Sequence, residues 1–139
     1  MALLSDSPSS LASVVAAEGG TPGQLVADAA KAGGKTSGVA GEFRVGGQTL
    51  VDVSGSQTPI RPEVQEALDS VPENLRPKWH GGCAEPRCVS QALDAGLDPS
   101  TGSMTAYQIG DVNPQVPHGG VRSPCASCEV LRDWFRYDQ

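Results

Sequence analysis

The sequence has few aromatic residues and no long apolar run. Phe, Trp and Tyr make up 4% of its 139 residues, whereas 17 glycines and 11 prolines predict a chain with many turns. No stretch approaches the roughly 20 apolar residues of a membrane-spanning helix. No lysine or arginine precedes Lys31, so the N-terminus lacks the basic region of a secretory signal peptide. We therefore expect a soluble protein with no membrane partner.

Positive charge is also scarce. The chain has ten Lys and Arg residues and 16 Asp and Glu residues, which gives a formal net charge of −6. This balance argues against tight, nonspecific binding of nucleic acid over a broad surface. A local basic groove is still compatible with it, as is a set of ordinary solvated surface charges. The basic residues that flank the two cysteine-containing stretches are Arg76, Lys78, Arg87 and Arg122.

Three of the four cysteines have the spacing of a metal site. Cys125 and Cys128 are three residues apart at a predicted helix start, so they point the same way, and Cys83 would supply a third thiolate. A catalytic zinc with three protein ligands keeps a fourth position for water and lowers the pKa of that water to about 7. Glu85 lies close enough to Cys83 to take the proton without binding the metal. We predict that Glu85 is the general acid/base.

Two prolines place this predicted site between helix N-termini. Pro86 and Pro124 each suit a first helical turn, where a missing N–H is tolerated. The exposed N–H groups of helix starts favour thiolates over thiols. Two alternatives stay open: Cys125 and Cys128 as a redox pair, or a structural zinc with Cys88 or His80 as fourth ligand. A closed structural site would not explain Glu85, and cysteines used for metal binding indicate a reducing compartment.

Hydrophobic periodicity predicts an α/β domain. We interpret residues 1–20 as a linker or short helix and residues 21–139 as a single domain. The predicted elements are a helix from Pro22, a β-hairpin over 37–54 turning at Gly46-Gly47, helices from Pro62 and after the first motif, a strand over 104–109 and a helix from about Ala126. We expect Cys88, Trp134 and Phe135 to be core residues.

The two cysteine stretches together resemble the cytidine deaminase superfamily. Zinc nucleobase deaminases carry H-x-E…P-C-x-x-C and admit an all-cysteine ligand set, and here cysteine takes the place of the histidine. The matching stretches are Trp79-His80-Gly81-Gly82-Cys83-Ala84-Glu85-Pro86 and Arg122-Ser123-Pro124-Cys125-Ala126-Ser127-Cys128. Over roughly residues 36–137 the chain looks like YwqJ-like and related deaminase domains at the C-termini of bacterial polymorphic toxins.

This resemblance implies a three-layer α/β/α fold with a mixed sheet that starts with the hairpin. It also implies Zn²⁺ held by Cys83, Cys125 and Cys128, with Glu85 as proton shuttle. The superfamily usually has one or two further strands after the second motif helix, whereas this chain stops eleven residues past Cys128. We therefore expect a sheet that is shortened or completed by another segment.

The implied activity is hydrolytic deamination of cytosine to uracil, with DNA that is single-stranded or has a flipped-out base as the favoured substrate. Alternatives are deamination of free cytidine, of nucleotides or of adenine in nucleic acid, and, from another class, a noncatalytic zinc-stabilised binding module. The resemblance further implies a toxin secreted into the cytoplasm of competing bacteria and an immunity protein in the producer. The candidate substrate contacts are Trp79, His80, Ala84, Arg122 and Ser123, with His118 in a glycine-rich loop that could close on the substrate.

Overall fold

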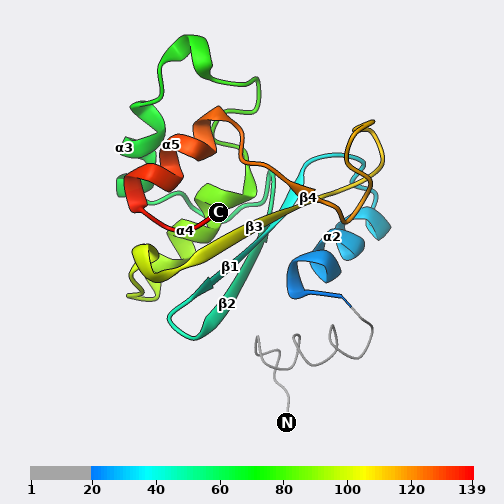
Figure 1. Ribbon diagram of the computed structural model, residues 1–139, viewed down its shortest axis with the longest axis horizontal. Helices are drawn as coiled ribbons and strands as arrows, with labels where there is room; N and C mark the ends of the chain where they lie inside the picture. The colour runs from blue at the N-terminus through cyan, green and yellow to red at the C-terminus, as the bar shows by residue number, and fades with distance from the viewer. Residues whose placement is uncertain (1–19) are drawn as a thin grey trace.

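The structure is a computed structural model that describes residues 20–139. In this part of the chain, four α-helices accompany a four-stranded sheet (Figure 1). The helices are α2 (Pro22–Ala32), α3 (Pro62–Asp69), α4 (Ala84–Asp94) and α5 (Ala126–Phe135), and the strands are β1 (Val39–Val45), β2 (Gln48–Val53), β3 (Ser103–Gln108) and β4 (Val121–Arg122). Two 3₁₀ turns, η1 (Glu73–Leu75) and η2 (Pro99–Thr101), lie in the connections. The interpretation of residues 1–20 as a linker or short helix lies outside the described residues except for Gly20.

The sheet has the strand order β2-β1-β3-β4, and each pair of neighbouring strands is antiparallel. The hairpin is confirmed: Val45 pairs with Gln48 across Gly46 and Gly47, whose φ angles of 58° and 76° suit a two-residue turn with both central residues left-handed. The prediction of a mixed sheet is wrong for these four strands. A mixed sheet needs a crossover that returns a strand parallel to its neighbour, and here the chain between β3 and β4 is an irregular loop.

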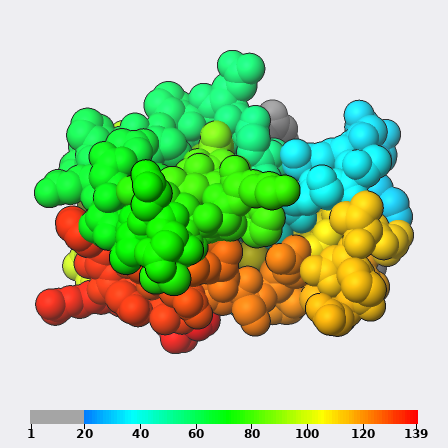
Figure 2. All heavy atoms as spheres, turned by 90° about the horizontal axis from the view of Figure 1, so that it is seen from above, coloured from blue at the N-terminus to red at the C-terminus, as the bar shows by residue number. Residues whose placement is uncertain are grey.

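The helices cover both faces of the sheet. Alternation along β1 places Phe43 and Val45 in one core with α3, α4 and α5, and Ala40 in a second core with α2. The first core also contains Val64, Leu68, Cys88, Val89, Met104 and Leu131, and the second contains Ala27, Tyr107 and Ile109. Cys88 is therefore a core residue, as predicted. Seen from above, α3 and α4 lie beside α5, and the segment after α2 lies beside the loop that follows β3 (Figure 2).

Buried Glu42 fixes α2 on the sheet. Although Glu42 is a charged residue, it is only 1% exposed. Its Oε1 accepts a hydrogen bond of 2.8 Å from the N–H of Gly23, and the other oxygen pairs with Arg44. A carboxylate at a helix N-terminus is favourable because the first N–H groups have no partner within the helix. This contact holds the first turn of α2 against β1.

The end of the chain lies against β3. The N–H of Met104 donates to the carbonyl of Asp138 at 2.7 Å, and the N–H of Asp138 donates to the carbonyl of Gly102 at 3.0 Å. Ser103 and Asp138 form an isolated parallel bridge. The edge of β3 that faces away from β1 is therefore shared between the two-residue β4 and these last residues.

One predicted core residue is exposed. Phe135 packs against the core, but Trp134 has 45% of its surface accessible to solvent. The stripe of α5 that faces the core contains Cys128 and Leu131, so Trp134 and Phe135, which are adjacent on the helix, cannot both point along it. The prediction for Trp134 was therefore wrong. Among residues 20–139, no helix is both long and apolar enough to cross a membrane.

Candidate metal centre and adjoining cavity

Three thiols meet where two helices begin. Cys83 is the N-cap residue of α4, Cys125 is the N-cap residue of α5, and Cys128 lies in the first turn of α5. Their sulfur atoms all lie within 4.8 Å of one another, and the Sγ atoms of Cys83 and Cys125 are 4.0 Å apart. All four cysteines of the chain are free thiols. Pro86 lies in the first turn of α4, whereas Pro124 precedes the cap of α5 instead of opening the helix.

This geometry fits a tetrahedral metal ion. Two thiolates bound to zinc at about 2.3 Å in tetrahedral geometry lie about 3.8 Å apart, close to the separation of Cys83 and Cys125. Neither Cys88 nor His80 belongs to the cluster. Cys88 is fully buried in the core, and the Nδ1 atom of His80 is 2.6 Å from the hydroxyl of Ser127. Among the described residues, the chain thus offers three sulfur ligands and leaves a fourth position to be filled by something else.

The helix starts favour one thiolate in particular. The thiols of Cys128 and Cys83, and also the backbone N–H groups of Cys128 and Ser127, donate hydrogen bonds to Cys125 and lower its pKa. Hydrogen bonding to Cys125 raises the pKa of both Cys83 and Cys128, because each of these thiols would lose its hydrogen bond to Cys125 on ionising. A bound cation would favour the thiolate form of all three cysteines.

Glu85 lies beside this cluster as a buried carboxyl group. It is 3% exposed, and its burial raises its pKa above the ordinary value. Oε2 accepts a long hydrogen bond of 3.4 Å from the Nε2 of Gln139, whereas Oε1 is buried without a partner. A buried polar atom with no partner is uncommon and costs about 1–3 kcal/mol. Such an atom at the edge of a cavity is available to a ligand or a water molecule.

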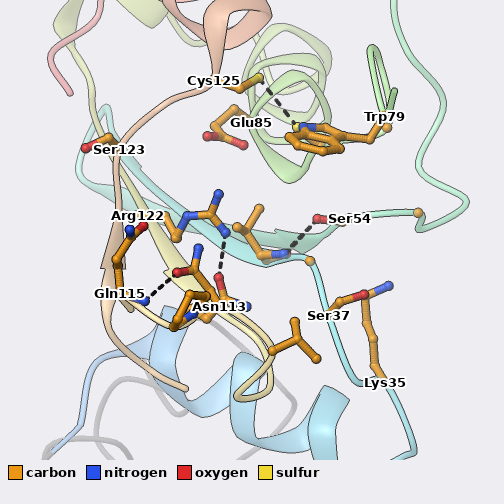
Figure 3. A pocket seen from close by; sticks show the side chains of 18 residues that line it. Lys35, Ser37, Ser54, Trp79, Glu85, Asn113, Gln115, Arg122, Ser123 and Cys125 are labelled. Carbon is orange, nitrogen blue, oxygen red and sulfur yellow. Dashed lines mark hydrogen bonds between the residues drawn. The ribbon is translucent and has the colours of Figure 1, made fainter. Parts of the chain in front are cut away.

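A cavity of about 690 Å³ opens onto Glu85, Cys83 and Cys125 (Figure 3). This volume is within the usual range for sites that bind small molecules. Segments from distant parts of the chain form its wall: the segment between α2 and β1, the turn after β2, the loop before α4, and the loop between β3 and β4. The lining residues outside the motifs are Lys35, Ser37, Gly38, Val39, Ser54, Gly55, Gln108, Val112, Asn113, Pro114 and Gln115.

Three of the five candidate substrate contacts line this cavity. Trp79, Arg122 and Ser123 do so, and Trp79 keeps 54% of its surface exposed. His80 and Ala84 are not lining residues. His80 instead joins the loop before α4 to the first turn of α5 through Ser127, and Ala84 is fully buried.

The flanking arginines have separate structural contacts. Arg87 donates to the carbonyls of Ser56, Gly81 and Cys83 at 3.1–3.2 Å, which ties the ligand Cys83 to the turn after β2. Arg76 donates to the carbonyls of Val71 and Asp69. Lys78 is exposed and lies outside the cavity lining. Of the four basic residues that flank the motifs, only Arg122 lines the cavity, where its Nη1 donates to the Oε1 of Gln108.

His118 anchors the loop after β3, which forms the wall of the cavity on the side away from the two motifs. The N–H of Gly110 donates to its Nδ1 at 2.9 Å, so Nε2 carries the proton and donates to Asp28 at 2.7 Å. Asp111 reinforces the anchor, since it accepts from the N–H of His118 at 3.0 Å and from Lys31 at 3.2 Å. These contacts fasten the loop after β3 to α2.

The sequence motifs did not reveal the polar residues on the far side of the cavity. Lys35, Asn113 and Gln115 come from irregular segments, and no local spacing marks them. The one available signal was the cluster of Gly and Pro residues in 110–120, which is typical of a functional loop.

Comparison of the chain with family models, curated proteins and solved structures finds no match.

Proposed function

We propose that this chain is a zinc-dependent hydrolytic deaminase that converts cytosine to uracil, with DNA that is single-stranded or has a flipped-out base as the favoured substrate. The observation that carries the proposal is the position of Glu85. Its buried carboxyl group, with one oxygen unpartnered, shares a cavity with two of the three clustered thiols. A structural metal site does not require such a carboxyl group, because all four coordination positions of its metal are filled by protein ligands.

Cys83, Cys125 and Cys128 would hold the metal at the starts of α4 and α5. Zinc bound there supplies a water molecule of lowered pKa at its open position. The N–H groups at the start of α5 stabilise the negative charge on Cys125, and Arg87 holds the backbone of Cys83 in place. The arrangement of helices on both faces of the sheet is compatible with the three-layer α/β/α deaminase fold, which is part of this proposal.

Glu85 would move the proton. Its Oε1 would accept a proton from the attacking water as the water oxygen bonds to C4 of the base, and would deliver a proton to the exocyclic nitrogen as the C4–N bond breaks and ammonia leaves. Oε2 stays oriented by Gln139. Burial raises the pKa of this carboxyl group, which makes its carboxylate form a better proton acceptor. Trp79 lines the cavity and would stack on the base, while Arg122 and Ser123, which also line it, would offer donors to the polar edge of the base or to the sugar.

The wider biological role rests on the two sequence motifs. They suggest a toxin domain delivered into the cytoplasm of competing bacteria and an immunity protein that neutralises it in the producer. Free cytidine, nucleotides and adenine in nucleic acid are the alternative substrates. The noncatalytic alternative is a binding module stabilised by zinc.

Mass spectrometry of treated substrates tests the activity. Single-stranded DNA, duplex DNA, RNA and free nucleosides would each be incubated with the zinc-loaded protein and with Glu85→Gln in parallel. We expect uracil from the unaltered protein and a loss of about 10²–10⁴-fold in the variant, because general acid/base catalysis contributes about that much. The zinc content of the variant should be unchanged.

Two results would contradict the proposal. One is equal activity in the Glu85→Gln variant. The other is no product from any substrate although zinc is bound and the fold is intact, which would favour the binding module. Formation of hypoxanthine instead of uracil would identify adenine as the base that the protein deaminates.

A further inference from the structure

The cavity contains two cationic side chains although the chain is acidic. The chain has a net charge of −6, yet Glu85 is the one carboxyl group among the described residues that line the cavity, whereas Lys35 and Arg122 are both present. Neither of these cations forms an ion pair with a residue that the structure describes. Arg122 contacts the neutral amide of Gln108, so its charge is not cancelled. This concentration of charge favours a ligand with a negative group.

Lys35 is held at the end of the cavity opposite Glu85 (Figure 3). Its backbone N–H donates to the carbonyl of Ala30 at 3.0 Å, which closes the end of α2 and fixes the start of the lysine side chain. The side chain lies over two glycines: its Cε is 3.2 Å from where a Cβ on Gly38 would be, and its Nζ is 3.8 Å from the corresponding point on Gly55. Both glycines have positive φ angles. Because neither glycine has a side chain, the ammonium group of Lys35 has room to lie there.

Further hydrogen-bond donors line the same cavity. The Oδ1 of Asn113 accepts from the N–H groups of Gln115 and Val116, so the amide nitrogen of Asn113 is the group left for a ligand. Ser37 and Gln115 also line the cavity. A phosphate group has several acceptor oxygens and no donor at neutral pH, and a cavity that holds a lysine together with neutral donors matches it.

We infer that this end of the cavity, with Lys35 as the cationic contact, binds a phosphate group attached to the nucleoside whose base lies at Glu85. The inference rests on the proposed function for the identity of the base, but the phosphate site itself does not depend on catalysis. The phosphate can belong to a mononucleotide or to the backbone of a nucleic-acid strand, and both present the same oxygens to Lys35.

Calorimetric titration of the Glu85→Gln variant separates these cases without turnover. The ligands are cytidine, its 5′- and 3′-monophosphates, and a single-stranded pentanucleotide with one cytosine and no terminal phosphate. Each would be titrated into the zinc-loaded variant alone and combined with Lys35→Gln, Lys35→Arg or Lys78→Gln. Lys78→Gln is the matched control, because it removes the same charge from an exposed lysine outside the cavity.

We expect at least one phosphate-bearing ligand to bind about tenfold more tightly than cytidine, as for a hydrogen bond to a charged group. Lys35→Gln should remove this difference, whereas Lys35→Arg and Lys78→Gln should keep it. Tight binding of a monophosphate assigns the site to nucleotides. Tight binding of the pentanucleotide alone assigns it to a strand, and Lys35→Gln should then lower the slope of log affinity against log salt by about one between about 50 and 200 mM.

Equal affinities for cytidine and all phosphate-bearing ligands, or no binding by any of them, would overturn the inference. So would equal effects of Lys35→Gln and Lys78→Gln. The two proposals fail differently. Phosphate binding that depends on Lys35, with no deaminated product from the unaltered protein, would reject the activity alone. Product formation with no contribution from Lys35 would reject the phosphate site alone.

Discussion

Gly41 controls how closely β1 approaches the helix that carries the first motif. A Cβ added at Gly41 would lie 3.1 Å from the Cβ of Ala84 and 3.1 Å from the Sγ of Cys88, both of which are fully buried. Carbon atoms in favourable contact are about 3.5–4.0 Å apart. Gly41→Ala therefore requires β1 and the first turn of α4 to separate by about half an ångström.

The expected loss of stability follows from this overlap. Overpacking a close-packed core by one methyl group costs about 1–3 kcal/mol, which lowers the Tm of a domain of this size by roughly 4 to 12 °C. Ala84 is the residue between Cys83 and Glu85, so the displacement also reaches the metal ligands. We expect weaker zinc binding together with the lower Tm, measured by thermal unfolding and by competition with a chromophoric chelator.

Two companion variants test the reasoning. In Gly33→Ala the new Cβ would lie 3.4 Å from the carbonyl of Ala29 at an ordinary φ of −81°, so we expect a change within about 0.5 kcal/mol. In the double variant Gly41→Ala/Cys88→Ala, removal of the buried sulfur makes room for the added methyl group and should recover part of the loss. If Gly41→Ala is as stable as Gly33→Ala and binds zinc normally, the close packing of β1 on α4 does not position the site.

The remaining predictions concern the metal and the loop. Substituting serine for any one of the three clustered cysteines should abolish stoichiometric zinc in elemental analysis, whereas Cys88→Ala should keep one zinc per chain; loss of zinc in Cys88→Ala would place that residue in the site after all. His118→Phe removes the acceptor for the Gly110 N–H and the donor to Asp28. We expect faster hydrogen exchange across residues 110–120 with unchanged zinc content, and unchanged exchange would show that the loop is held by other contacts.

Local patterns identified most of the secondary structure. The hairpin at Gly46-Gly47, the helix from Pro22 and the amphipathic stretch after Cys125 are fixed by turn chemistry, capping and periodicity, which act over a few residues. Whether a side chain is buried depends in addition on contacts with distant parts of the chain. Glu42 is buried because α2 brings an unpaired N–H to it, and Trp134 is exposed because the core-facing side of α5 is already occupied by Cys128 and Leu131.

The sequence by itself determined which side chains can bind a metal. The spacing of Cys125 and Cys128 at a helix start, and of Cys83 and Glu85 at another, is a local property of the backbone. Only the tertiary structure decided that the two helix starts meet, that His80 bridges them, and that Lys35 and the loop after β3 enclose a cavity in front of Glu85. The reason is physical: those contacts join residues far apart along the chain, and they form only when the two cores pack against the shared sheet.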